Sequence, residues 1–129
     1  MNNKPIKLAL IFFLCSSVLT TEAQAVSVYD GIYSTNPDVG YVYLREQQGL
    51  MVAVLNQTVN DVLIWAAATG QLNGSSVHLS SIIGYVNFEM DLDFTSTSSF
   101  QATQKACVPQ PEASCLFQNG KAFTGNKIW

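Results

Sequence analysis

Residues 85–94 read YVNFEMDLDF, and their alternation decides the fold class. Every second position from Val86 to Phe94 carries an apolar side chain, whereas the positions between them carry an asparagine and three carboxylates. Successive side chains of a β-strand point to opposite faces of a sheet. This stretch therefore predicts a strand with one face in a core and the other face in water.

Short apolar or alternating runs recur along the rest of the chain, and turn-forming residues separate them. Asparagine, glycine and proline mark these turns, because the first two tolerate positive φ and proline fixes φ. No stretch shows helical periodicity over a useful length. The strands predicted in this way cover residues 28–34, 40–46, 50–57, 62–69, 76–83, 85–94, 98–105 and 122–129.

We therefore predict an all-β domain, a small antiparallel up-and-down β-barrel of about eight strands. Closure into a barrel leaves no exposed sheet edge, and a compact β-sandwich is the alternative. A membrane-spanning barrel is disfavoured, because most of the predicted strands are shorter than the ~9–11 residues that such barrels need.

Residues 1–25 have the features of a secretion signal. Two lysines precede an apolar run from Leu8 to Leu14, and Ala23-Gln24-Ala25 offers a small-x-small cleavage site. The apolar run is too short for a membrane anchor. We expect this segment to be removed, leaving one domain over residues 26–129 with no membrane span and a periplasmic or extracellular location.

Two cysteines remain in the expected domain, Cys107 and Cys115, on either side of a proline-bearing loop. In an exported chain this spacing predicts a disulfide, which contributes about 2–3 kcal/mol in the chain-entropy model. A metal site is disfavoured because there is no Cys-x-x-Cys and the single histidine is far away in sequence, so no metal and no cofactor is expected. The formal net charge of −3 argues against a nucleic-acid partner, which needs clustered cations.

The first half of the expected domain carries turn formers and aromatic residues in a distinctive order: Gly31-Ile32-Tyr33, Asn36-Pro37, Gly40-Tyr41, Gln47-Gln48-Gly49, Met51 and Trp65. This order resembles a group of uncharacterised secreted bacterial β-rich domains that read approximately G-[LI]-[WY]-x-x-N-P-x-x-x-G-[WY], followed by Q-x-G and a strand with Leu-Trp. The resemblance implies a secreted bacterial β domain, but the group has no agreed activity to transfer. The opening Gly31-x-Tyr33 is also similar to the first strand of lipocalin-like barrels, which hold small apolar ligands in their mouths.

His78 and the acidic face of residues 89–93 are the candidates for catalysis. Ser76 and Ser80 share the predicted face of His78, yet neighbours two apart on one strand stand ~6.5–7 Å from each other, beyond a hydrogen bond. Glu89, Asp91 and Asp93 place their carboxylates in a row along one strand face. A cation needs several oxygens directed at one point, which a single strand cannot supply. We therefore interpret His78 and these carboxylates as ordinary solvated positions on strands and assign no catalytic residue.

Aromatic residues suggest a binding surface instead. Tyr41 and Tyr43 are expected on one strand face, and Trp65 lies in a run that is apolar on both faces. Flat rings with polar tips suit amphipathic ligands, so these three residues are the predicted ligand-binding set. A strand that is apolar on both faces must be covered on both sides. We expect this cover to be a neighbouring segment or a second subunit that packs on the stretch from Leu50 to Ala68.

The function predicted from the sequence is that of a secreted or periplasmic non-enzymatic β domain that binds a small apolar or amphipathic ligand or a protein partner. One alternative is a small secreted hydrolase that uses His78 or the Glu89/Asp91/Asp93 face. The other is an inhibitor of a cell-wall hydrolase or protease that inserts the Pro109/Pro111 loop.

Overall fold

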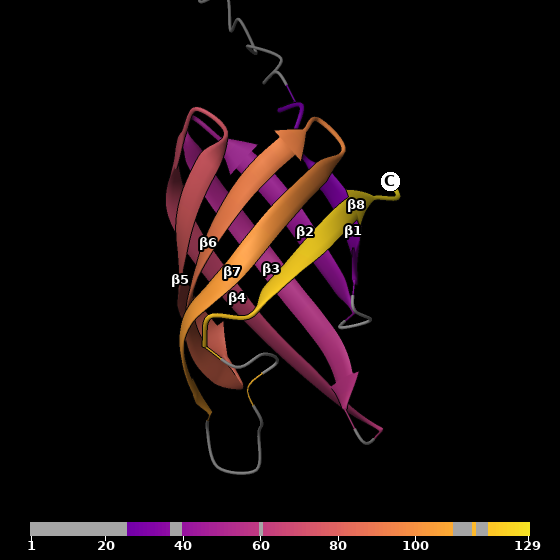
Figure 1. Ribbon diagram of the computed structural model, residues 1–129, viewed down its shortest axis with the longest axis vertical. Coiled ribbons are helices and arrows are strands. Elements are labelled where there is room, and N and C mark those ends of the chain that lie inside the picture. Colours follow the sequence, from indigo (N-terminus) through magenta and orange to yellow (C-terminus); the bar gives the residue numbers. More distant parts are fainter. Residues whose placement is uncertain (1–25, 37–39, 60, 110–114, 116–118) are drawn as a thin grey trace, which may run out of the picture.

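The computed structural model of this chain describes residues 26–36, 40–59, 61–109, 115 and 119–129, and the expected secretion signal lies outside them. The fold is a closed barrel of eight antiparallel strands, in which each strand pairs with its neighbour in sequence and the last pairs with the first (Figure 1). The strands are β1 (Gly31–Asn36), β2 (Tyr41–Gln47), β3 (Leu50–Val59), β4 (Val62–Asn73), β5 (Ser76–Gly84), β6 (Val86–Ser96), β7 (Ser99–Pro109) and β8 (Ala122–Lys127). The predicted up-and-down barrel is confirmed, and the sandwich alternative is not adopted.

Most strands lie within a few residues of their predicted positions, but the first begins later. Residues 28–30 were expected to be part of it, whereas β1 begins at Gly31. The Tyr29 ring stacks on Phe94 with ring centroids 3.9 Å apart, and Asp30 Oδ1 accepts a hydrogen bond of 2.6 Å from the amide of Glu46. These contacts hold the segment across the end of the barrel instead of in the sheet.

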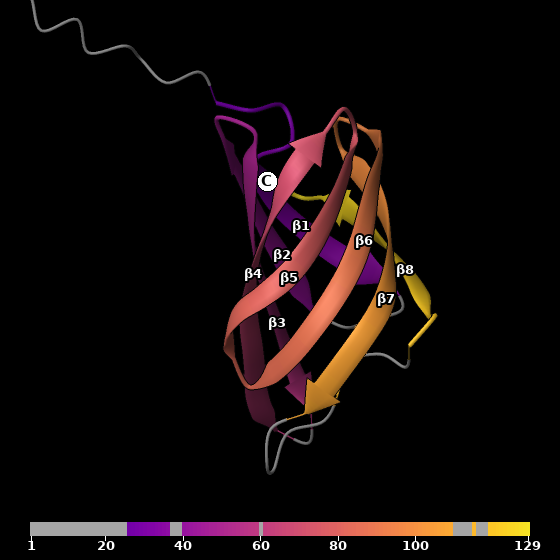
Figure 2. The ribbon, with the colours of Figure 1, turned by 90° about the vertical axis from the view of Figure 1, so that its left-hand side faces the viewer.

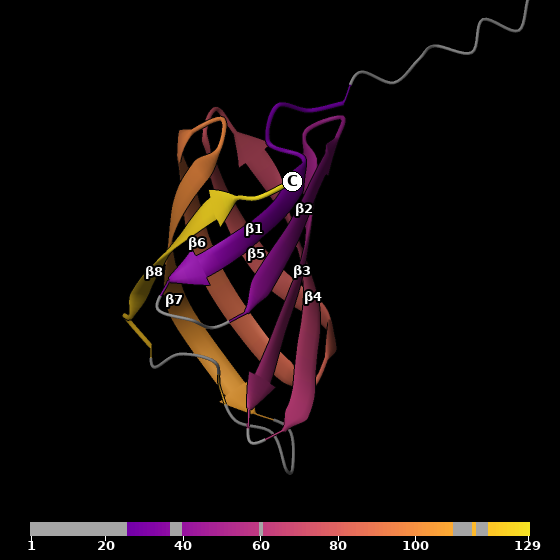
Figure 3. The same ribbon diagram turned by 90° about the vertical axis from the view of Figure 1, so that its right-hand side faces the viewer.

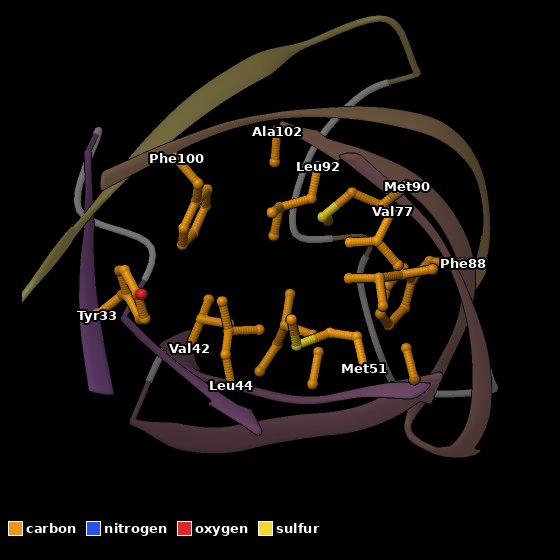
Figure 4. Packing of buried hydrophobic residues seen from close by; sticks show 14 of the residues in the cluster. Tyr33, Val42, Leu44, Met51, Val77, Phe88, Met90, Leu92, Phe100 and Ala102 are labelled. Atoms are coloured by element: carbon orange, nitrogen blue, oxygen red, sulfur yellow. The ribbon is translucent and has the colours of Figure 1, made fainter. Parts of the chain in front are cut away.

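The barrel interior is filled by the alternating apolar side chains that the sequence pattern singles out. Figure 4 shows such side chains pointing inward from the strands that surround them. No member of this buried cluster is more than 7 % exposed. A water-sized molecule therefore finds almost no accessible surface among them, as expected for a close-packed core. The described core residues therefore leave little free space inside the barrel.

Among the described residues there is no helix with the length and apolar character needed to cross a membrane.

A disulfide joins Cys107, near the end of β7, to Cys115, with Cα atoms 6.0 Å apart. The predicted pairing is thereby confirmed. The loop between the two cysteines, residues 108–114, is the element that the inhibitor alternative would insert. Residues 108 and 109 belong to the end of β7, and residues 110–114 lie outside the described residues.

Tyr33 is a fully buried tyrosine at the β1 side of the core, and its hydroxyl donates a hydrogen bond of 2.8 Å to the carbonyl of Tyr29. Burial, reinforced by the nearby Asp30 carboxylate and by Tyr29, raises the pKa of Tyr33 to about 12. The folded state thus favours the neutral phenol, so this contribution to stability is complete below the unfolded pKa of about 10 and is lost as the pH rises towards 12.

We expect the free energy of unfolding to fall by about 2–3 kcal/mol over that pH range because of Tyr33 alone. Urea unfolding of the wild type and of Tyr33→Phe at a series of alkaline pH values measures this fall, which should be smaller in the variant. The difference between their ultraviolet absorbance titrations should show one phenol that ionises near pH 12. Equal alkaline sensitivity of the two proteins would contradict the assignment.

Candidate functional site

The outer surface of the barrel has two chemically different sides. The side formed by β2, β3, β4 and the turn between β5 and β6 faces the viewer in part in Figure 3. Its outward residues, here called the apolar wall, are Tyr41, Tyr43, Val52, Val54, Leu63, Trp65, Ala67, Ile83 and Tyr85. The opposite side, seen in Figure 2, is formed by β5, β6 and β7. Its outward residues, the polar wall, are Ser76, His78, Ser80, Asn87, Glu89, Asp91, Asp93, Gln101, Thr103 and Lys105.

The strand register brings the apolar wall into continuous rows. Tyr43 pairs with Val54, Val54 with Ala67, and Ala67 with Ile83, so one apolar row crosses four strands. Directly opposite residues on neighbouring strands have their side chains in contact on the same face. The wall is therefore one contiguous surface and not a scatter of exposed apolar residues.

One end of this wall, near the start of β4 and the β5–β6 turn, is built around Trp65 and Tyr85. The amide of Tyr85 donates a hydrogen bond of 3.0 Å to the carbonyl of Trp65, and the two rings meet edge to face with centroids 6.2 Å apart. An irregularity in the β4–β5 pairing moves the register by one residue at Ile82, so that Ile83 faces outward beside Ala67. Trp65 and Tyr85 remain 37 % and 49 % exposed.

The polar wall holds a charged cluster around Asp91. His78 Nδ1 lies 2.6 Å from Asp91 Oδ1, and Lys105 Nζ lies 3.0 Å from Asp91 Oδ2. The hydrogen bonds with His78 and then with Lys105 lower the pKa of Asp91, so its carboxylate stays ionised to lower pH than usual. All three side chains are about half exposed, so the cluster is a solvated surface network of small energetic weight.

Among the described residues, the hydrogen-bond partner of the His78 imidazole is a carboxylate and not a hydroxyl. The imidazole Nε2 lies 4.0 Å from Glu89 Oε2, and the hydroxyl of Ser76 hydrogen-bonds with Asp93 instead. Serine hydrolysis requires a hydroxyl within reach of the imidazole that the carboxylate orients. Nor do the described residues contain a group of three or more His, Cys, Asp or Glu side chains that could hold a metal ion.

A groove of about 400 Å³ is lined by residues of the segment before β1, of β2 and of the segment after β8. These three segments lie together at the upper end of the barrel in Figure 3. Side chains of mixed chemistry line it: Asp30, Tyr43, Arg45, Glu46, Gln47 and Trp129. Its volume falls within the range of about 300–1,000 Å³ that small-ligand sites occupy.

The three predicted ligand-binding aromatics all lie on the outside of the barrel. Tyr41, Tyr43 and Trp65 belong to the apolar wall, and Tyr43 also reaches the groove. Their role in binding stays a prediction. Sequence reasoning missed Arg45 and Trp129 as groove residues, because only the pairing of β1 with β8 brings the two ends of the described chain together.

Sequence reasoning also missed the partner of His78. Asp91 lies opposite it on the neighbouring strand, whereas the search along the sequence considered serines on the same strand. A register assigned to the β5–β6 hairpin would have found this pair.

Comparison of the chain with protein-family models, with curated proteins and with solved structures found no match in any of the three.

Proposed function

We propose that this chain is a secreted, non-enzymatic binding domain whose working surface is the apolar wall, and that a second copy of the chain covers this wall. The observation that carries the proposal is the concentration of exposed apolar side chains on one side of a barrel whose interior is already filled. Such a surface does not contribute to the core of its own molecule. It is an interaction surface by its chemistry.

The apolar wall is as large as the largest apolar patches on ordinary monomers, and it would supply most of one side of a standard interface. Tyr41, Tyr43, Leu63, Trp65, Ile83 and Tyr85 are between 37 % and 60 % exposed. With about 200 Å² for a large side chain, these residues alone present on the order of 600 Å². The largest patch on an ordinary monomer reaches about 300–600 Å², and a standard interface buries about 800 Å² on each partner.

The small amount of charge on this surface favours a second copy over a different partner, and Arg45, which pairs with Val52 on the outer face, is the charged residue at its edge. Every residue of the apolar wall is uncharged, and the outward Asn56 between Tyr41 and Trp65 is polar but neutral. A two-fold contact places the same patch on both subunits, so a charged patch would face its own charge. An uncharged apolar patch can face itself without this repulsion.

Two further features support a location outside the cytoplasm and a role away from the lipid bilayer. The Cys107–Cys115 disulfide is of the kind that persists in oxidising compartments. A barrel that spans a bilayer carries an apolar band around its whole circumference and a polar lumen. This barrel has carboxylates at Glu89, Asp91 and Asp93 on its outside and an apolar interior.

Sedimentation velocity over a range of micromolar concentrations tests the proposal. We expect the wild type to sediment as a dimer, and the double variant Leu63→Glu/Ile83→Glu to sediment as a monomer, because each subunit then places two carboxylates in the interface. The matched control Ser80→Glu/Thr103→Glu adds the same charge to the polar wall and should leave the dimer intact.

Circular dichroism and urea unfolding establish that each variant is folded. A folded wild-type protein that stays monomeric at high micromolar concentration would overturn the proposed self-association. So would a double variant that remains a dimer.

A further inference from the structure

The groove at the upper end of the barrel adjoins the apolar wall at Tyr43 and has a different chemistry. Two aromatic residues, Tyr43 and Trp129, line it together with residues that donate or accept hydrogen bonds. We propose that this groove binds a neutral saccharide.

The apolar part of the groove is held in place by the backbone. The carbonyl of Trp129 accepts a hydrogen bond of 2.8 Å from the amide of Ile32, and the carbonyl of Ile32 accepts one of 2.8 Å from the amide of Ile128. A Cβ atom on Gly31 would lie 2.4 Å from the Trp129 carbonyl oxygen, so only glycine allows this close approach. The Trp129 side chain nevertheless remains 85 % exposed, as a platform on a fixed support.

The polar part of the groove is also partly fixed. Asp30 Oδ1 accepts a hydrogen bond from the Glu46 amide, and Glu46 Oε1 accepts one from the Gly49 amide, each 2.6 Å long. Each carboxylate keeps a second oxygen that can accept hydrogen bonds from a ligand. Arg45 has no carboxylate within 4.0 Å among the described residues, so its guanidinium donors are available, as are the amide donors of Gln47.

This combination matches the chemistry of a sugar ring. The hydroxyls of a saccharide both donate and accept hydrogen bonds, and its C–H faces pack on flat aromatic side chains such as Trp129 and Tyr43. An anionic ligand would face the two carboxylates, and a cationic ligand would face Arg45. A neutral polyol can hydrogen-bond with the carboxylates, the guanidinium and the amide together, and no like charges then face each other.

Fluorescence titration gives a direct test, because the chain has two tryptophans. In the Trp65→Phe background, Trp129 is the only reporter. We expect its emission to change on addition of a neutral sugar from a panel of glucose, galactose, N-acetylglucosamine and cellobiose, and to change far less with glucuronate or glucosamine. Isothermal titration calorimetry of the wild-type chain provides a second measurement of each Kd.

Two groove variants and one matched control complete the test. Trp129→Ala and Asp30→Asn should each weaken the binding of the neutral sugar at least tenfold. The asparagine retains the oxygen that accepts from the Glu46 amide, so the local fold is kept. Asp93→Asn removes the same charge from the polar wall and should leave the Kd unchanged.

Three outcomes would overturn the saccharide site. These are a folded wild-type protein that binds no neutral sugar of the panel, a preference for the charged sugars, and neutral-sugar binding that survives both groove variants. Self-association through the apolar wall is measured separately with the Leu63 and Ile83 changes, so either proposal can fail without the other.

Discussion

Replacement of Phe100 by alanine should lower the free energy of unfolding by about 3–5 kcal/mol, the range for a large aromatic removed from a close-packed core. Phe100 is 1 % exposed and lies at the centre of an aromatic cluster. Its ring centroid is 5.2 Å from that of Tyr33, 6.0 Å from that of Phe123 and 6.3 Å from that of Phe94. The last two contacts are edge to face, a favourable geometry for aromatic pairs.

The cost should be large because the strands around Phe100 cannot close over the gap. The ring lies against the backbone of its partner Gly125, where an added Cβ would approach the ring to 2.2 Å. A closed barrel has no free edge that could move inward, so the cavity left by the truncation stays open. Marginal stability of about 5–15 kcal/mol for ordinary domains makes this a large fraction of the total.

Urea unfolding followed by circular dichroism measures the effect of Phe100→Ala, with Phe100→Leu as the comparison that removes less volume. The leucine variant should lose less, because it leaves a smaller cavity. A loss below about 1 kcal/mol for the alanine variant would contradict the central place of this ring in the core.

The inner face of the barrel could be predicted from the sequence because alternation assigns it directly. Residues 86–94 were expected to alternate between core and water, and the structure buries Val86, Phe88, Met90, Leu92 and Phe94. The period of two is a property of any strand and needs no knowledge of its neighbours. The number of strands and the closed architecture followed from the same pattern and its turns.

The outer face could be predicted only in part. The sequence showed that β4 is apolar on both faces, and the structure places Ile64 and Ala66 inward while Leu63 and Trp65 point outward and stay exposed. Of the two kinds of cover that were expected, a neighbouring segment is not seen among the described residues. The exposed face is what makes self-association the leading proposal.

The groove could not be predicted, because it depends on register and closure. The pairing of Tyr33 with Lys127 sets which side chains meet where the first and last strands join. Alternation specifies a face but not how far one strand is shifted along another. The segment before β1 adds to the uncertainty, since side-chain contacts of Tyr29 and Asp30 remove it from the strand that its apolar residues suggested.

Replacement of Gly84 by alanine is expected to destabilise the barrel by on the order of 3–5 kcal/mol, because it combines backbone strain with a clash. Gly84 has φ of +138°, a conformation that residues with a side chain rarely adopt. An added Cβ would lie 2.4 Å from Ala66 Cα and 2.6 Å from the Trp65 carbonyl oxygen. Both neighbours are backbone atoms, so the β4–β5 pairing itself would have to separate.

This separation should also reach the apolar wall, because the Trp65 carbonyl that would be displaced accepts the hydrogen bond from the Tyr85 amide. We therefore expect Gly84→Ala to weaken self-association as well as to lower the urea midpoint. Gly74→Ala is the matched control. Gly74 also has positive φ, +64°, but an added Cβ meets no atom within 4 Å, so only the strain of about 1–2 kcal/mol remains.

Urea unfolding of the two glycine variants and of the wild type separates the cost of backbone strain from the cost of the steric clash. Sedimentation velocity of the same samples measures self-association through the apolar wall. The tryptophan fluorescence of Gly84→Ala should change in the folded state, since Trp65 lies beside the substituted strand, whereas that of Gly74→Ala should not. Equal losses of stability in the two variants would show that β4 and β5 tolerate a methyl group at position 84. The close approach of these strands at Gly84 would then not be what limits the stability of their pairing.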